Sequence, residues 1–304
     1  MGTEIVSSIK SRDGTTKFLV RLDDGNLIEC VLLIQDYGNT VCVSSQVGCK
    51  MGCKFCASGC GGFVRNLTVN EMFAQVNLAR QQSPEGTKLT HIVLMGMGEP
   101  FDNFDNVAEF LRRVDIGARK ISVSTCGLPD KIRAFADLKM QVNLCISLHA
   151  SNDGVRRKIM PIANKYAIAD IMSAVKYFFD KTKRRVIFEY ALIDNVNCAP
   201  EHARELASLL HKAKISYHVN LINLNAGGGA LKPPPKPVAM NFMDTLIKSG
   251  ISCTMRKGKG TDIMASCGQL RLNTSDIRST MERSDDVRSM AACGQLRRQN
   301  EETK

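Results

Sequence analysis

The sequence predicts an α/β protein in which parallel strands form an open or partial barrel behind a small N-terminal β unit. Two observations lead to this prediction. Six apolar segments rich in β-branched residues alternate with stretches of helical period, a pattern typical of parallel sheets with helical crossovers. Loops rich in Gly and small polar residues follow five of these segments, and such folds bind ligands at the carboxyl ends of their strands.

The chain begins with a predicted β-hairpin. Residues 17–22 (KFLVRL) and 27–34 (LIECVLLI) are apolar, and the sequence DDGN between them suits a tight turn. We therefore assign residues 1–38 to a small β unit.

The barrel follows. Its six expected strands are TVCVSS (40–45), HIVLMGM (91–97), KISVST (120–125), VNLCISL (142–148), RVIFEYALI (185–193) and YHVNLINL (217–224). Helical period is clear, for example, at 103–114, 168–180 and 201–213. A seventh strand, ISCTMR (251–256), comes last, and a closed eight-stranded barrel would need more units than this. We assign 39–273 to a partial (β/α)6 barrel and 274–304, where the apolar period fades, to a flexible tail.

Composition limits the class of protein. Hydrophobic residues make up 44% and charged residues 23% of the 304 residues, ordinary values for a globular chain. The sequence has neither a signal-peptide pattern nor an apolar run of membrane-span length, so we expect a cytoplasmic protein with no membrane association. We also expect a monomer. Twelve cysteines in a reducing compartment indicate metal binding or catalytic thiols rather than disulfides.

The formal charge of +11 is compatible with a nucleic-acid partner. Basic residues gather at 156–158, 181–185 and 256–259. Each cluster alone is typical of a solvated helix end or loop, but together they make an RNA partner plausible.

The sequence VGCKMGCKFCASGC (47–60) is the strongest chemical signal. Cys49, Cys53 and Cys56 have the spacing C-x3-C-x2-C, which allows three thiolates to hold one face of an iron–sulfur cluster. The alternative is a structural zinc site with Cys60 as the fourth ligand. Zinc ribbons prefer two separated C-x2-C pairs, so we favour the cluster.

This spacing resembles that of radical S-adenosylmethionine enzymes, and other motifs narrow the match. They are, in chain order, CVSSQVGC, GFVRNLTVNE, MGMGEP, ISLHAS, RRKIMPI and DIMASCGQL. Together they resemble the RlmN/Cfr family of adenine methyltransferases over about residues 5–273. The resemblance implies a 4Fe–4S cluster, S-adenosylmethionine, an RNA substrate (23S ribosomal RNA and, for some members, transfer RNA) and an electron donor such as flavodoxin or ferredoxin.

The family's reaction needs these cofactors because C2 and C8 of adenine are electron-poor and are not nucleophiles. In the family, one S-adenosylmethionine methylates a cysteine. A second gives a 5′-deoxyadenosyl radical that takes hydrogen from the new methyl group. The carbon radical then adds to the base, and a second cysteine releases the adduct.

By resemblance, Cys267 carries the methyl group, Cys42 resolves the adduct and Glu29 accepts the proton. From residue type alone, Cys42 would be a small core residue of a strand, and Glu29 would be a solvent-facing hairpin residue. Cys267, in a Gly-flanked loop, would be an exposed thiol.

The resemblance also places seven residues at the S-adenosylmethionine cofactor. They are Gly98, Glu99, Ser124, Ser147, Leu148, His149 and Asn225. Glu99 offers the carboxylate that the methionine ammonium group needs. Taken alone, His149 could equally be a satisfied rim histidine, and Asn225 a turn residue.

Three features depart from the family pattern. The family commonly has a helical module ahead of the hairpin, whereas this sequence starts almost at the hairpin. Cys126 in STCG replaces the usual Ser or other non-thiol residue. The segment MASCGQLR (264–271) recurs as MAACGQLR (290–297), so Cys293 could compete with Cys267, although the preceding KGKGTDI favours Cys267.

Two other readings remain open at this point. One keeps the radical chemistry and replaces the RNA by another substrate. The other is a non-enzymatic RNA-binding protein in which the cysteines hold a structural metal. The GMGEP and SLHAS loops count against the second reading, because a structural metal site needs no second ligand pocket beside it.

Overall fold

The computed structural model describes residues 3–225 and 230–270. The predicted tail, 274–304, and Cys293 lie outside these residues. The division of the chain at residues 38 and 39 stays a prediction.

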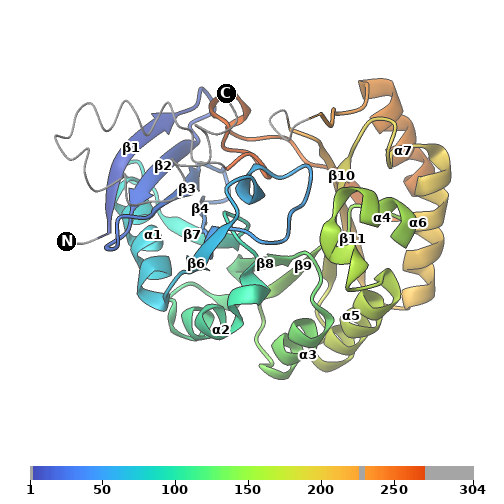
Figure 1. Ribbon diagram of the computed structural model, residues 1–304, viewed down its shortest axis with the longest axis horizontal. Coiled ribbons are helices and arrows are strands. Elements are labelled where there is room, and N and C mark those ends of the chain that lie inside the picture. Colours follow the sequence, from blue (N-terminus) through green and yellow to red (C-terminus); the bar gives the residue numbers. More distant parts are fainter. Residues whose placement is uncertain (1–2, 226–229, 271–304) are drawn as a thin grey trace, which may run out of the picture.

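One curved ten-stranded sheet runs through the molecule in the order β1-β2-β3-β4-β7-β8-β9-β10-β11-β12 (Figure 1). From β4 onward all neighbours are parallel. These strands are β4 (Asn39–Cys42), β7 (Leu89–Leu94), β8 (Ile121–Thr125), β9 (Asn143–Ser147), β10 (Val186–Leu192), β11 (Tyr217–Asn223) and β12 (Cys253–Met255). They coincide with the six predicted barrel segments and the seventh strand, so the predicted partial α/β barrel is confirmed.

The N-terminal strands extend the same sheet. The predicted hairpin is β2 (Thr16–Arg21) and β3 (Leu27–Leu33), and an additional strand, β1 (Glu4–Lys10), pairs with β2. β3 pairs antiparallel with β4, which joins the hairpin to the barrel. A separate two-stranded sheet is formed by β5 (Gln46–Gly48) and β6 (Phe63–Asn66).

Helices cover the outside of the curved sheet (Figure 1). They are α1 (Val69–Gln81), α2 (Phe104–Arg113), α3 (Pro129–Asp137), α4 (Asp153–Ile159), α5 (Ile168–Thr182), α6 (Pro200–Ala213) and α7 (Lys236–Lys248). Local chemistry fixes their first residues: Thr68 and Glu71 form a capping box on α1, and proline occupies the first turn of α3 and α6.

Aromatic rings fill the space between sheet and helices. Phe101, Phe135 and Phe178 are buried, and their ring centroids lie 5.2 Å and 6.0 Å apart in succession. This packed core holds the carboxyl ends of the strands in fixed positions. Among the described residues, no helix is long and apolar enough to cross a membrane.

The first and last parts of the described chain meet. Residues 256–270, the Cys267 loop, follow β12 and reach the turn between β1 and β2. Ser11 Oγ donates a hydrogen bond to Asp262 Oδ1 (2.6 Å), and Gly260 N donates one to Asp13 Oδ2 (3.0 Å). The Cys267 loop thus spans from the last strand of the sheet to the first hairpin.

Candidate active site

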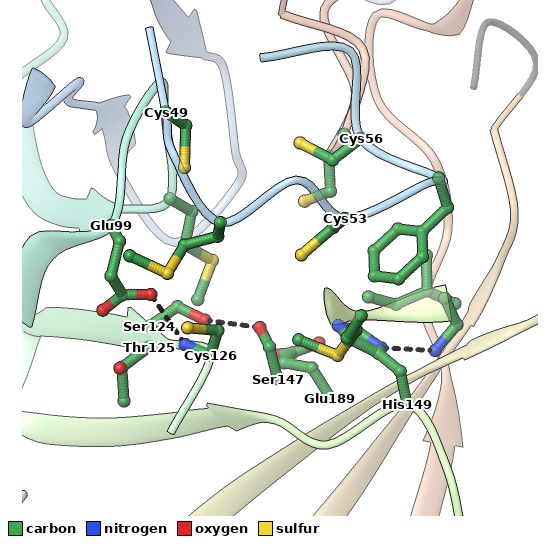
Figure 2. A pocket seen from close by; sticks show the side chains of 18 of the residues that line it. Cys49, Cys53, Cys56, Glu99, Ser124, Thr125, Cys126, Ser147, His149 and Glu189 are labelled. Atoms are coloured by element: carbon green, nitrogen blue, oxygen red, sulfur yellow. Dashed lines mark hydrogen bonds between the residues drawn. The ribbon is translucent and has the colours of Figure 1, made fainter. Parts of the chain in front are cut away.

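A cavity lies at the carboxyl ends of the parallel strands, and the thiols of Cys49, Cys53 and Cys56 line one side of it. Figure 2 shows these thiols facing Ser124, Cys126 and Ser147 across the space. We call this the first cavity. The sequence-predicted metal ligands are therefore brought together at the rim where the fold positions ligands.

The loop that carries the three cysteines, residues 47–62, is fixed at both ends. β5 pairs with β6, and Cys49 N donates a hydrogen bond to Gly62 O (2.9 Å). Further along, Ala57 N donates to Gly268 O (2.8 Å), which ties this cysteine loop to the Cys267 loop. The cysteine thiols therefore sit on a braced segment.

The chemistry of the three thiols suits an iron–sulfur cluster. Burial raises the pKa of Cys49 to about 12, and it raises the pKa values of Cys53 and Cys56 as well, so cationic iron is needed to keep them as thiolates. Within residues 3–225 and 230–270, no three metal-binding side chains are grouped tightly enough for a single ion. Cys60, the fourth ligand of the zinc alternative, is exposed and does not line the cavity. A cluster fits because it spans separated thiols around one space.

Glu99 also lines the first cavity and is held by backbone groups. Its Oε1 accepts a hydrogen bond from Phe101 N (3.0 Å), and its Oε2 accepts one from Cys126 N (2.7 Å). Burial raises its pKa. Gly98, beside it, has φ +103°, and a Cβ there would lie 2.6 Å from Cβ of Gln46. Only glycine fits this turn, which presents the carboxylate to the cavity.

The other predicted cofactor residues divide into two groups. Ser124, Ser147 and Asn225 line the first cavity, with the hydroxyls of Ser124 and Ser147 3.3 Å apart. Leu148 does not line it, because its side chain is fully buried and its N–H donates to Glu189 O (3.1 Å). Any contact of Leu148 with a ligand would therefore be indirect.

His149 lines the cavity in a strained backbone conformation, φ +56°. Its Nδ1 accepts a hydrogen bond from Ala191 N (2.9 Å), and its ring packs edge-on against Phe55 with centroids 4.8 Å apart. Burial, helped by the nearby Arg156 charge, lowers its pKa to about 3. The ring is therefore neutral with its proton on Nε2.

Two charged residues of the first cavity form a pair that has no local signal in the sequence, although Arg256 belongs to the predicted basic cluster at 256–259. Glu189, on β10, accepts a hydrogen bond from Asn220 Nδ2 (3.0 Å), and its Oε2 lies 3.5 Å from Arg256 Nη1. Arg256 follows β12 and also lines the cavity. Their pairing depends on the strand order, which places β10 and the end of β12 at one rim.

A second cavity adjoins the first and holds both candidate catalytic cysteines, Cys42 and Cys267. Arg256 and Asn225 line both cavities, and Asn225 Nδ2 donates a hydrogen bond to Cys267 O (3.0 Å). Cys42 is buried, which raises the pKa of its thiol. Cys267 is exposed, as its Gly-flanked loop predicted; desolvation by neighbouring groups raises the pKa of its thiol, and Arg256 opposes that shift. Cys267 also lines both cavities, so it lies where the first cavity adjoins the second.

Glu29 is not the solvent-facing hairpin residue that its type alone suggested. Its side chain is buried, and its Oε1 lies 2.9 Å from Nζ of Lys17, which is also buried. Glu29 lines neither cavity. Because side chains alternate along a strand, Glu29 lies on the same face of β3 as Val31, which lines the second cavity. The cation of Lys17 offsets the cost of burying the carboxylate.

The three basic clusters lie in different parts of the structure. In the 156–158 cluster, Arg156 is fully buried, and its guanidinium donates to the carbonyls of Leu148 (3.1 Å), Cys126 and Ser147. The 181–185 cluster precedes β10 and so lies at the edge of the sheet opposite the cavities. Of the three, only the 256–259 cluster lines the second cavity.

Comparisons with known proteins agree with this site. A model of the radical SAM superfamily matches residues 43–210. The chain is 50% identical over 268 residues to a Clostridium perfringens protein named a probable dual-specificity RNA methyltransferase RlmN, covering 86% of this chain and 76% of that protein. It is 48% identical over 276 residues to a Carboxydothermus hydrogenoformans protein of the same name, covering 88% and 80%.

The chain belongs to the RlmN family of radical SAM enzymes. A solved structure of a radical SAM methyltransferase from Sphaerobacter thermophilus agrees with the fold: its TM-score is 0.86 at 43% identity, over 89% of this chain and 82% of that one. The cofactors of this RlmN-family chain are a 4Fe–4S cluster and S-adenosylmethionine. The three thiols and the polar wall of the first cavity provide places for both.

Proposed function

We propose that this chain is a radical S-adenosylmethionine methyltransferase that methylates C2 or C8 of an adenine in 23S ribosomal RNA and in transfer RNA. The observation that supports this most strongly is the placement of Cys42 and Cys267 in one cavity that adjoins the three cluster thiols. Two thiols at a common substrate space are what a reaction needs when one cysteine carries carbon to the base and another releases it. The relatives named as RNA methyltransferases point to the same substrate class.

In this proposal Cys49, Cys53 and Cys56 hold the cluster. Gly98, Glu99, Ser124, Ser147, Leu148, His149 and Asn225 form the S-adenosylmethionine site, with Leu148 acting indirectly from behind the cavity wall. When bound, the two cofactors supply the radical chemistry that removes hydrogen from a methyl group. The Glu99 carboxylate suits the ammonium end of the methionine moiety, and the neutral His149 ring offers an Nε2–H donor.

The chain's own residues then handle carbon and protons at the second cavity. The Arg256 cation favours the thiolate of Cys267, the form that accepts a methyl group. Burial keeps Cys42 protonated until it is needed as the resolving thiol. Glu29, whose Oε1 lies 2.9 Å from the Lys17 ammonium group, is in this proposal the carboxylate that accepts the proton lost by the base.

The remaining parts of the proposal concern partners and location. The cluster needs a one-electron reductant, and a flavodoxin or ferredoxin is the class of protein that provides one. We further infer that the enzyme works in the cytoplasm, where thiols stay reduced, and that it acts as a monomer.

The experiment has two parts. First, mass analysis of RNA from cells with and without this protein should reveal one methyladenine that depends on it. Second, Cys42→Ala should accumulate a covalent protein–RNA adduct, because the methylene-bridged base forms on Cys267 but is not released. The adduct should appear as a nuclease-sensitive mass increase on the peptide that holds Cys267.

The matched control is Cys30→Ala, which removes a buried thiol on the neighbouring strand outside both cavities. It should turn over without an adduct. Full turnover by Cys42→Ala would contradict the role of Cys42, and an adduct on the Cys293 peptide would move the carrier role to the tail repeat. RNA that is identical with and without the protein would refute the function.

A further inference from the structure

An exposed tyrosine stands at the rim of the second cavity. Tyr37 is 67% exposed, the largest exposed fraction among the large apolar side chains that the structure describes. It lines the same cavity as Cys42 and Cys267. A large aromatic side chain left in water at the edge of a functional cavity marks a surface for a partner with an aromatic or apolar face.

The turn that carries Tyr37 is fixed in place. Gly38 N donates a hydrogen bond to Gln35 O (3.0 Å), closing the turn between β3 and β4. Gly38 has φ +117°, and a Cβ there would lie 2.1 Å from Oγ1 of Thr90 on β7. The absence of a side chain at residue 38 therefore lets the turn press against the sheet and hold Tyr37 at the rim.

The Tyr37 ring is braced by the ring of His91. The His91 ring meets it nearly perpendicularly, at 85° with centroids 5.2 Å apart, and His91 Nδ1 is 2.8 Å from Thr90 Oγ1. An edge contact of this kind orients the ring and leaves much of its surface open. Tyr37 is thus a pre-positioned stacking surface, with little ordering entropy left to lose when a ligand binds.

The lining of the cavity identifies the charge of the ligand. Arg256, Lys257 and Lys259 line it, and no Asp or Glu occurs among its described lining residues. An aromatic platform beside cations is the arrangement that binds single-stranded nucleic acid, because bases stack on the ring while phosphates meet the cations.

We propose that Tyr37 stacks on the base next to the target adenosine, while Lys257 and Lys259 contact the adjoining phosphates. The inference rests on the proposed function, since it assumes that the target adenine itself reaches Cys42 and Cys267. Cys42 lies inward, only 9% exposed, so a base that reaches both thiols enters the cavity, whereas Tyr37 lies at the surface. One base cannot fill both positions, so the nucleotide at Tyr37 is a neighbour. Tyr37 is then a positioning residue that holds the RNA while the target base is extruded.

The test uses the cluster-loaded enzyme under anaerobic conditions and a synthetic RNA stem-loop around the methylated adenosine. 2-Aminopurine replaces the base on the 5′ side in one probe and on the 3′ side in another. Wild-type enzyme should quench one of the two probes, and Tyr37→Ala should lose the quenching. The same variant should raise the Kd for the stem-loop about 5- to 100-fold.

Two further variants separate stacking from other effects. Tyr37→Phe keeps the ring and should quench as the wild type does, whereas Tyr37→Leu keeps apolar bulk and should not. Tyr177→Ala removes a tyrosine from helix α5, on the outside of the barrel, and should leave the quenching and Kd as in the wild type.

The outcomes distinguish the two proposals. If wild-type enzyme neither binds nor methylates the stem-loop, the proposed function fails. If it methylates the stem-loop but Tyr37→Ala and Tyr37→Leu keep wild-type quenching and affinity, the function stands and the stacking role is wrong.

Discussion

At the scale of single residues, His149 shows how burial sets the chemistry of the site. The histidine is 5% exposed, and burial lowers its pKa to about 3, against about 6.5 in an unfolded chain. Between these two values the unfolded chain binds a proton that the folded chain does not. The free energy of unfolding therefore rises with pH across this window, and the contribution is complete above about pH 6.5.

We predict that His149→Gln flattens this pH dependence. In wild-type protein the His149 contribution should fall by up to about 1.4 kcal/mol per pH unit on acidification below pH 6.5, and the variant should lose that slope. Urea unfolding of cluster-free protein over this range measures it, since acid loss of iron then plays no part. His211→Gln, on an exposed face of α6, is the matched control. Equal slopes in His149→Gln and wild type would contradict the prediction.

Residue-level chemistry could be predicted only where it is local in sequence. The spacing of Cys49, Cys53 and Cys56 indicates a cluster because all three thiols lie within eight residues. Glu189, and its pairing with Arg256, could not be found this way, because strand order alone brings the two residues together. Arg156 looked like part of a basic surface, yet it lies inside the protein, where three backbone carbonyls accept hydrogen bonds from its Nε and Nη2.

At the scale of elements, the β5–β6 pair determines where the cysteine loop begins. Gly48 has φ +72°, and a Cβ there would lie 1.9 Å from Gly62 O, the acceptor of the Cys49 N–H. The position has no room for any side chain. The first cluster thiol therefore depends on a glycine one residue before it.

We predict that Gly48→Ala loses most of its iron after anaerobic reconstitution, because the new methyl group pushes Gly62 away and displaces Cys49. Gly62→Ala is a close control: its φ is also positive, +75°, but the added Cβ meets nothing within 4 Å. That variant should bear only backbone strain of about 1–3 kcal/mol and keep its iron. Iron and sulfide assays measure both, and equal loss in the two variants would show that strain rather than the clash is responsible.

Most elements could be predicted from period and composition, because the barrel strands are apolar runs in a polar context. The exceptions have physical reasons. β1 is largely polar and half exposed, so it has no apolar run. β5 and β6 are three and four residues long, too short to show any alternation, and the turn at Gly48 sets their pairing.

At the scale of the whole molecule, the position of positive charge matters more than its amount. Lys257 and Lys259 line the second cavity, whereas Lys183 and Arg185 precede β10 at the opposite edge of the sheet. The seven residues of β10 separate these edges by roughly 20 Å. A Debye length of about 8 Å at physiological salt isolates the two groups from one another.

We predict that replacing both Lys257 and Lys259 by Glu weakens RNA binding strongly and reduces the slope of log K against log salt by about two. Replacing Lys183 and Arg185 by Glu changes the net charge equally, from +11 to +7 in each case because each substitution removes two charges. This second variant should bind RNA nearly as the wild type does. Titrations at several salt concentrations compare them, and equal weakening would mean that net charge alone governs binding.

The Cys267 loop also has a consequence for the order in which the enzyme is made. The ribosome releases the amino end first, and Cys267 emerges 211 residues after Cys56. By then the β1–β2 turn, which binds Asp262 and Gly260, has already left the ribosome, and so has the cysteine loop, which binds Gly268. A nascent chain that stops short of residue 256 carries every cluster thiol and lacks the methyl carrier. The Cys267 loop therefore docks onto two surfaces that have already been synthesised, and the second cavity gains Cys267 only after every cluster thiol is present.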